Sequence, residues 1–169
     1  MDWRAWCALV MGVWVELPRS VVERARREAE RLGVTLGEYI ADRLLADADP
    51  PVRAEGYALA ASELLGQARR ALSNGDLRAS AGAAWGAAAL ALRAHAASRG
   101  QSLDSDGLWR YTRRLSAELG EWVCDAWAHA VAMRHCFLEG GCTHWHVERA
   151  LGYIERLVSQ AAPVGGEGA

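Results

Sequence analysis

The chain has 169 residues, enough for one domain with a hydrophobic core or for one domain with a small appendage, and too few for two full domains. Hydrophobic residues make up 51% and charged residues 24% of the sequence, which is typical of a globular rather than a disordered protein. The net charge of −2 gives no general attraction to polyanions, so nucleic-acid binding would require a local basic patch.

The cysteines form no CxxC pair, and no secretory signal is evident. They are Cys7, Cys124, Cys136 and Cys142. We therefore expect reduced thiols in a cytoplasmic protein. The apolar run over residues 5–15 is too short to span a bilayer, so no membrane insertion is expected. Residues 1–10 are interpreted as an N-terminal extension, because the sequence pattern typical of regular secondary structure begins at Met11.

A strand followed by two helices is predicted first along the chain. Residues 13–17 alternate apolar and other side chains, the pattern of a short half-buried strand. Ser20 with Glu23, and Thr35 with Glu38, have the spacing of a capping box, in which a side chain at each end of the first turn bonds the backbone of the other. Each pair therefore predicts the start of a helix.

A helical bundle is predicted for the rest of the chain. Two prolines and two aspartates in residues 47–51 mark a boundary between the strand-helix-helix unit, residues 11–49, and the bundle, residues 52–160. Apolar residues then recur at steps of three and four, with glycine-rich breaks between the stripes. The fold class expected is all-α, an antiparallel up-and-down bundle, with residues 161–169 as a disordered tail.

Small residues are concentrated in the predicted helix over residues 77–99. Gly82 and Gly86 lie four residues apart and so share one face of that helix. They predict that a neighbouring helix approaches closely and fills the space beside Trp85.

Residues 57–158 resemble the archaeal PaREP family of small helical proteins. Five phrases carry the resemblance, at residues 74–78, 84–91, 108–111, 118–120 and 135–140. The PaREP family is itself similar to HEPN domains, antiparallel helical bundles found in nucleotide-associated proteins and RNA-cleaving toxins. This likeness implies the fold more than the function.

The resemblance to HEPN domains also implies where a catalytic site would lie. In ribonucleases of that group, an Arg is followed four to six residues later by a His on a late helix, and the pair serves proton transfer and phosphate stabilisation. None of the five histidines here has an Arg at that spacing before it, and Arg134 directly precedes His135. Adjacent residues on a helix point about 100° apart. Glu139 shares a face with His135, so Arg134, His135 and Glu139 are catalytic candidates, with an ordinary surface hydrogen bond as the alternative.

The N-terminal unit separately resembles a ribbon-helix-helix DNA-binding module. In that family, strands pair across a dimer and place outward side chains in the major groove. The outward positions here are Gly12, Trp14 and Glu16. A carboxylate and an indole are poor phosphate partners, and Glu reads only cytosine well, so a structural or dimerising role is favoured over DNA binding. Trp14 is the candidate contact to a nucleic acid.

Two further clusters contain residues able to bind ligands. Sulfur and imidazole groups could bind zinc, although their spacing matches no familiar zinc motif; the candidates are Cys136, Cys142, His144 and His146. His129 lies on an apolar stripe, which favours a hydrogen-bonded core histidine.

The arginines Arg110, Arg113 and Arg114 are candidates for binding a phosphate beside Trp109. The alternative is that they form a solvated helix surface. No phosphate-loop, GxSxG or HExxH motif is present, and no cofactor is expected.

These observations favour a homodimeric helical-bundle binding module without enzymatic activity. Its expected partner is a nucleotide, a nucleic acid or a protein, in a setting that resembles toxin–antitoxin systems. The alternatives are an RNA-processing ribonuclease of HEPN type and a ribbon-helix-helix DNA-binding regulator.

Overall fold

The computed structural model describes residues 16–161, which form helices and no strands. The helices, in chain order, are α1 Arg19–Leu32, α2 Leu36–Leu45, α3 Pro50–Ser73, α4 Leu77–Ala97, α5 Ser105–Leu119, α6 Trp122–Glu139 and α7 His144–Ala161. The all-α prediction is confirmed for this part of the chain. The predicted N-terminal extension, residues 1–10, lies outside the described residues, and so does the predicted tail except for Ala161, which ends α7.

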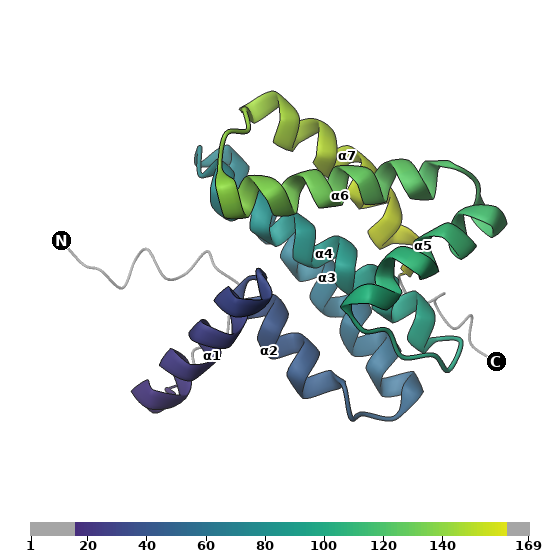
Figure 1. The fold of residues 1–169 in the computed structure, drawn as a ribbon, viewed down its shortest axis with the longest axis horizontal. Coiled ribbons are helices and arrows are strands. Elements are labelled where there is room, and N and C mark those ends of the chain that lie inside the picture. Colours follow the sequence, from purple (N-terminus) through teal and green to yellow (C-terminus); the bar gives the residue numbers. More distant parts are fainter. Residues whose placement is uncertain (1–15, 162–169) are drawn as a thin grey trace, which may run out of the picture.

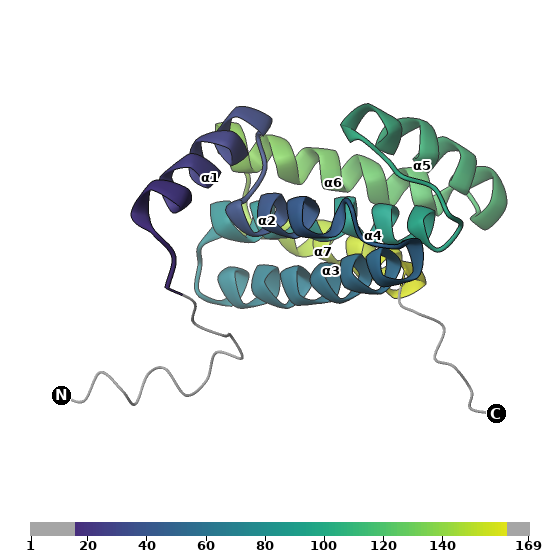
Figure 2. The same ribbon diagram turned by 90° about the horizontal axis from the view of Figure 1, so that it is seen from below.

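Helix α4 is the centre of the molecule. It packs antiparallel to α3 and also contacts α2, α5, α6 and α7. Every residue from Ser80 to Ala97 except His95 is buried. Figure 2 shows α3 and α6 on opposite sides of α4. The core is therefore built around one alanine-rich helix enclosed by its neighbours.

The glycines of α4 allow three neighbouring elements to approach closely. A Cβ atom on Gly82 would lie 2.7 Å from Cδ2 of Phe137 and 2.9 Å from Cγ2 of Thr35, and one on Gly86 would lie 3.0 Å from Cδ1 of Leu64. The predicted close approach is confirmed. At Gly82 it involves residues from α6 and from the start of α2, and Trp85 packs on Trp127 with ring centroids 5.1 Å apart.

The N-terminal unit contains α1 and α2. Thr35 caps α2, because its Oγ1 accepts a hydrogen bond from the amide of Glu38 at 3.2 Å. Ser20 does not cap α1: the helix begins one residue earlier, after Pro18, without a side-chain cap. Glu16 and Leu17 are in no strand, so this part of the predicted strand is wrong, while Val13 to Val15 lie outside the described residues.

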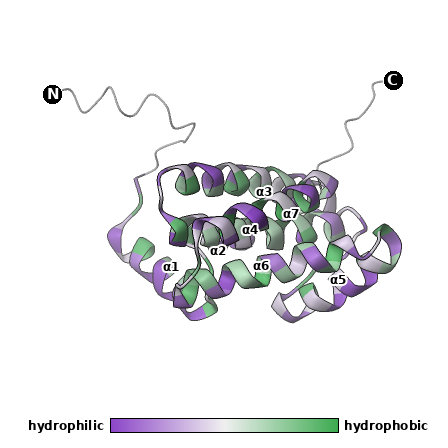
Figure 3. Cartoon of the chain, turned by 90° about the horizontal axis from the view of Figure 1, so that it is seen from above, coloured by the Kyte–Doolittle hydropathy of each residue, from purple (hydrophilic) through white to green (hydrophobic). Residues whose placement is uncertain are grey.

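Helix α1 extends away from the bundle (Figure 1). Among the described helices, its backbone lies close to that of α2 alone. Hydrophobic and hydrophilic positions mix along it (Figure 3). Val21 is exposed, whereas Ala29 is buried near the end of the helix. Only the C-terminal end of α1 is therefore held by the rest of the molecule.

Several predicted boundaries of the bundle are confirmed. Asp76 caps α4 by accepting a hydrogen bond from the amide of Ala79 at 2.9 Å. Gly120 and Gly140 follow the last residues of α5 and α6, and both have positive φ, the conformation that glycine tolerates best. No helix within residues 16–161 combines the length and apolar character needed to cross a membrane.

Candidate functional site

The catalytic candidates do not converge. Arg134 turns toward the end of α1, where its Nη2 donates to the carbonyl of Leu32 at 2.9 Å and its Nε donates to that of Gly33 at 3.3 Å. Its guanidinium also lies 5.4 Å from the ring centroid of Trp85. His135 is exposed on another side of α6 and lines a surface hollow. Glu139 is exposed and is not among the residues lining that hollow. Arg134 thus acts as a C-terminal cap for α1.

The zinc candidates meet only in part. Cys136 and Cys142 form a disulfide, with Cα atoms 5.7 Å apart, so the expectation of reduced thiols is wrong for this pair. His146 accepts a hydrogen bond at Nδ1 from the amide of Thr143, and His144 is exposed. No group of three or more metal-binding side chains occurs within the described part of the chain.

The hollow that His135 lines lies between the end of α6 and the start of α7. Its volume is about 340 Å³. The disulfide and the turn at Gly140 and Gly141 form one wall, with Met133 among the apolar lining residues. Polar and aromatic groups come from His129, His135, Trp145, His146 and Arg149. The hollow therefore has an apolar wall and several imidazole and guanidinium groups.

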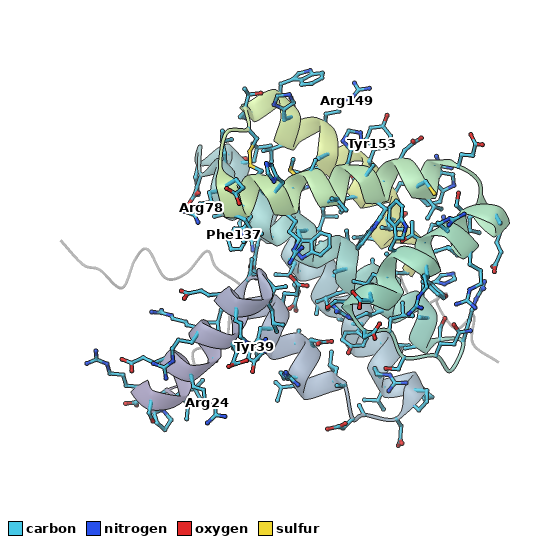
Figure 4. The ribbon with its side chains drawn as sticks, viewed as in Figure 1. Arg24, Tyr39, Arg78, Phe137, Arg149 and Tyr153 are labelled. Carbon is cyan, nitrogen blue, oxygen red and sulfur yellow. A yellow bond between two sulfur atoms is a disulfide. The ribbon has the colours of Figure 1, made fainter. Side chains whose placement is uncertain are left out.

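Trp145 and Arg149 lie on the same face of α7, because they are four residues apart. The indole of Trp145 is 59% exposed, and the guanidinium carbon of Arg149 lies 5.5 Å from its ring centroid. Arg149 also lies 5.9 Å from the ring centroid of Tyr153. Figure 4 shows Arg149 and Tyr153 together on α7. An exposed indole and a cation thus share the opening of the hollow.

The electrostatics of this hollow favour an anionic ligand. None of its described lining residues is a carboxylate. Burial lowers the pKa of His129, and the neighbouring Arg149 lowers it further. His129 is only half-buried and stacks on Tyr153 with ring centroids 4.2 Å apart, instead of being the core histidine that the sequence predicts. A neutral imidazole of this kind offers a flat ring surface, while Arg149 supplies the positive charge.

The arginines of α5 are divided between two surroundings. Arg110 and Arg114 line a polar hollow of about 610 Å³ together with Gln101 and Ser102, and Arg114 donates to the side chain of Gln101 at 3.1 Å. Arg113 is exposed and lies outside the lining of that hollow. Trp14, the other nucleic-acid candidate, lies outside the described residues.

A buried polar cluster joins α2, α3 and α4. Nη1 of Arg93 lies 3.8 Å from Oε1 of Glu38, and Nε of Arg93 lies 3.5 Å from Oδ1 of Asp42. Tyr57 donates to the same Asp42 oxygen at 3.0 Å. Both separations from Arg93 are longer than an ordinary hydrogen bond, and burial raises the pKa of Glu38 to about 7 in spite of the nearby Arg93. Burial also raises the pKa of Tyr57 to about 12. This cluster joins the N-terminal unit to the bundle.

Comparison with known protein families gives a match over most of the bundle. The model of the archaeal PaREP1/PaREP8 family matches residues 56–158, more than half of the chain. The chain belongs to this family. No match was found among curated proteins or among solved structures. The PaREP1/PaREP8 match covers α4 to α6 in full and most of α3 and α7, including the hollow between α6 and α7, whereas α1 and α2 precede it.

The sequence alone predicts neither the exposed face of α7 nor the buried position of Glu38. Trp145, Arg149 and Tyr153 have a readable spacing of four, but the sequence does not show that their common face is exposed. The spacing of Thr35 and Glu38 predicts a capping box, although the Glu38 side chain packs near Arg93. Contacts between distant segments determine both features.

Proposed function

We propose that this PaREP1/PaREP8 protein is a binding module that holds a nucleotide in the hollow between α6 and α7. The observation that carries the proposal is the exposed ring of Trp145 beside the guanidinium of Arg149, at the opening of an apolar hollow. A nucleobase would stack on the indole, and the phosphate would pair with Arg149 and with the imidazole of His146 or His135. A volume of about 340 Å³ falls in the range of small-molecule sites.

The test is calorimetric titration of the protein with adenosine monophosphate. We expect Trp145→Ala to lower the affinity at least about fivefold, because stacking of a base on an aromatic side chain contributes about 1–3 kcal/mol. Trp109→Ala is the matched control, since Trp109 is 54% exposed on α5, away from the hollow. Equal losses in the two variants, or no binding by the wild-type protein, would contradict the proposal.

The charge of the ligand is tested separately with adenosine. If Arg149 holds the phosphate, Arg149→Gln should weaken binding of the monophosphate and leave adenosine binding nearly unchanged. Arg110→Gln provides the control, because Arg110 lines the hollow on α5. A loss of monophosphate binding in Arg110→Gln alone would move the phosphate site to α5.

The ribonuclease alternative has less support than binding. Arg134 donates to two carbonyls at the end of α1, so its guanidinium is not directed at the hollow that His135 lines. A His135 site in that hollow would have to act without Arg134. RNA cleavage by the wild-type protein that His135→Ala abolishes would restore this alternative.

The homodimer is part of the proposal. Leu17 and Val21 are exposed at the start of α1, where the helix extends beyond the bundle. A second copy could cover these apolar side chains, as in the dimer that the ribbon-helix-helix resemblance implies. Light scattering should give twice the mass of one chain, and a strictly monomeric protein would refute the dimer. A role resembling toxin–antitoxin systems, or DNA regulation, would require this dimer as its first step.

A further inference from the structure

The face of α7 that contains Trp145 continues well beyond the first hollow. Trp145, Arg149, Tyr153 and Arg156 follow one another at steps of four, four and three residues, which places them in a single row along the helix. With a rise of about 1.5 Å per residue, this row extends about 16 Å. It therefore exceeds the opening of one hollow and spans much of the length of α7.

Helix α6 adds two more rings beside this row. The imidazole of His129 stacks on Tyr153, with ring planes 20° apart. Farther along, the guanidinium carbon of Arg156 lies 4.0 Å from the ring centroid of Trp122. Rings and guanidinium groups thus lie along the junction of the two helices in two sets of contacts, one around Arg149 and Tyr153 and one between Arg156 and Trp122. We call these six residues, Trp122, His129, Trp145, Arg149, Tyr153 and Arg156, the α6–α7 ladder.

A second hollow lies beside the ladder. Its volume is about 410 Å³, and its lining includes Tyr153 and Asp125. It shares His129 and Ala132 with the first hollow, so the two are contiguous. The Asp125 carboxylate would repel a phosphate but can accept hydrogen bonds from the amino groups of bases. The second hollow therefore suits a base more than a phosphate.

We infer that the α6–α7 ladder binds single-stranded nucleic acid, with one base at each of the two hollows and the backbone beside Arg149 and Arg156. This inference rests on the proposed nucleotide site and names its ligand class. Aromatic rings and arginines in series are the features by which proteins stack successive unpaired bases and neutralise the phosphates between them. A duplex keeps the faces of its bases covered by stacking, so its bases could not occupy the ladder.

The experiment compares adenosine monophosphate with oligoadenylates of two, three and four residues. In the wild-type protein, affinity should rise at least about fivefold from the monophosphate to the trinucleotide, because a second base occupies the hollow that Tyr153 and His129 line. A self-complementary oligonucleotide long enough to remain paired should bind more weakly than a single strand of the same length. Parallel titrations with ribose and deoxyribose oligomers identify the preferred strand.

Two variants locate the extra affinity. Tyr153→Ala should abolish the gain with length and keep the affinity for the monophosphate, and circular dichroism will show whether the variant remains folded. Arg156→Gln changes an exposed residue and provides the second measurement if Tyr153→Ala does not fold. Arg110→Gln is the control on α5 and should keep both affinities.

The outcomes separate the two proposals. Equal affinity for all lengths in the wild-type protein would overturn the ladder inference and leave the nucleotide site intact. Loss of the gain in Arg110→Gln, with none in Arg156→Gln, would also overturn it. Failure of every nucleotide to bind would overturn both proposals and would favour a protein partner for this face.

Discussion

At the scale of single residues, Glu38 is a buried carboxyl group with an unpartnered oxygen atom. It is 3% exposed, and its Oε2 has no hydrogen-bond partner in the structure. Arg93 faces it at 3.8 Å, too far for the short charge-assisted bond that would offset the loss of hydration. The carboxyl group is therefore held in surroundings that favour its protonated form.

The raised pKa of Glu38 predicts a stability that falls as the pH rises. The folded chain keeps a proton on Glu38 up to about pH 7, whereas the unfolded chain releases it near 4.5. The contribution of Glu38 protonation to the free energy of unfolding is complete below pH 4.5 and is lost between pH 4.5 and about pH 7. The loss amounts to about 3 kcal/mol for a pKa shift from 4.5 to about 7. Glu38→Gln should match the wild-type free energy of unfolding near pH 4.5 and exceed it near pH 8.

Urea unfolding measured across this pH range checks the prediction. Glu63→Gln, which changes an exposed glutamate of α3, should follow the wild-type curve throughout. Parallel curves for Glu38→Gln and the wild-type protein would show that Glu38 does not cause the pH dependence.

At the scale of elements, glycine has opposite effects in α4 and α7. An added Cβ at Gly82 would meet Phe137 and Thr35 closer than 3.0 Å, whereas none of the surrounding atoms comes within 4 Å at Gly152. Gly152→Ala should therefore raise the free energy of unfolding by about 0.5–1 kcal/mol, the usual advantage of alanine within a helix. Gly82→Ala should lower it by about 1–3 kcal/mol, because α2 and the end of α6 would have to move away.

Chemical unfolding measures the free energy of unfolding of both glycine variants, and Gly152→Ala is the control for helix propensity. If both substitutions stabilise the protein by the same amount, the close approach at Gly82 is not tight enough to matter. The two results together isolate the packing effect from the propensity effect.

At the scale of the whole molecule, the sequence predicts the features that depend on neighbouring residues better than those that depend on contacts between distant residues. The Thr35 and Asp76 caps and the breaks at Gly120 and Gly140 could be read from the sequence because each depends on residues only a few positions apart. Arg134 could not be assigned in this way, since the carbonyls that it caps are more than 100 positions earlier. The ladder needed the structure for the same reason, because α6 and α7 contribute to it together.

The position of the N-terminal unit gives the last prediction. The sequence placed its boundary at residues 47–51, yet α2 contributes Glu38 and Asp42 to the cluster around Arg93, while the backbone of α1 lies close to that of α2 alone and its last carbonyl accepts from Arg134. Native-state hydrogen exchange should therefore give α2 amides the same opening free energy as α4, and α1 amides a lower one.

Arg134→Ala should lower the opening free energy of α1 by about a further 1–2 kcal/mol, because two carbonyls lose a charged donor, and should change that of α4 less. Arg113→Ala on α5 is the matched control and should change neither. If α2 opens together with α1 and well before α4, the unit is a separate domain bounded at residues 47–51, and the buried cluster does not bind it to the bundle.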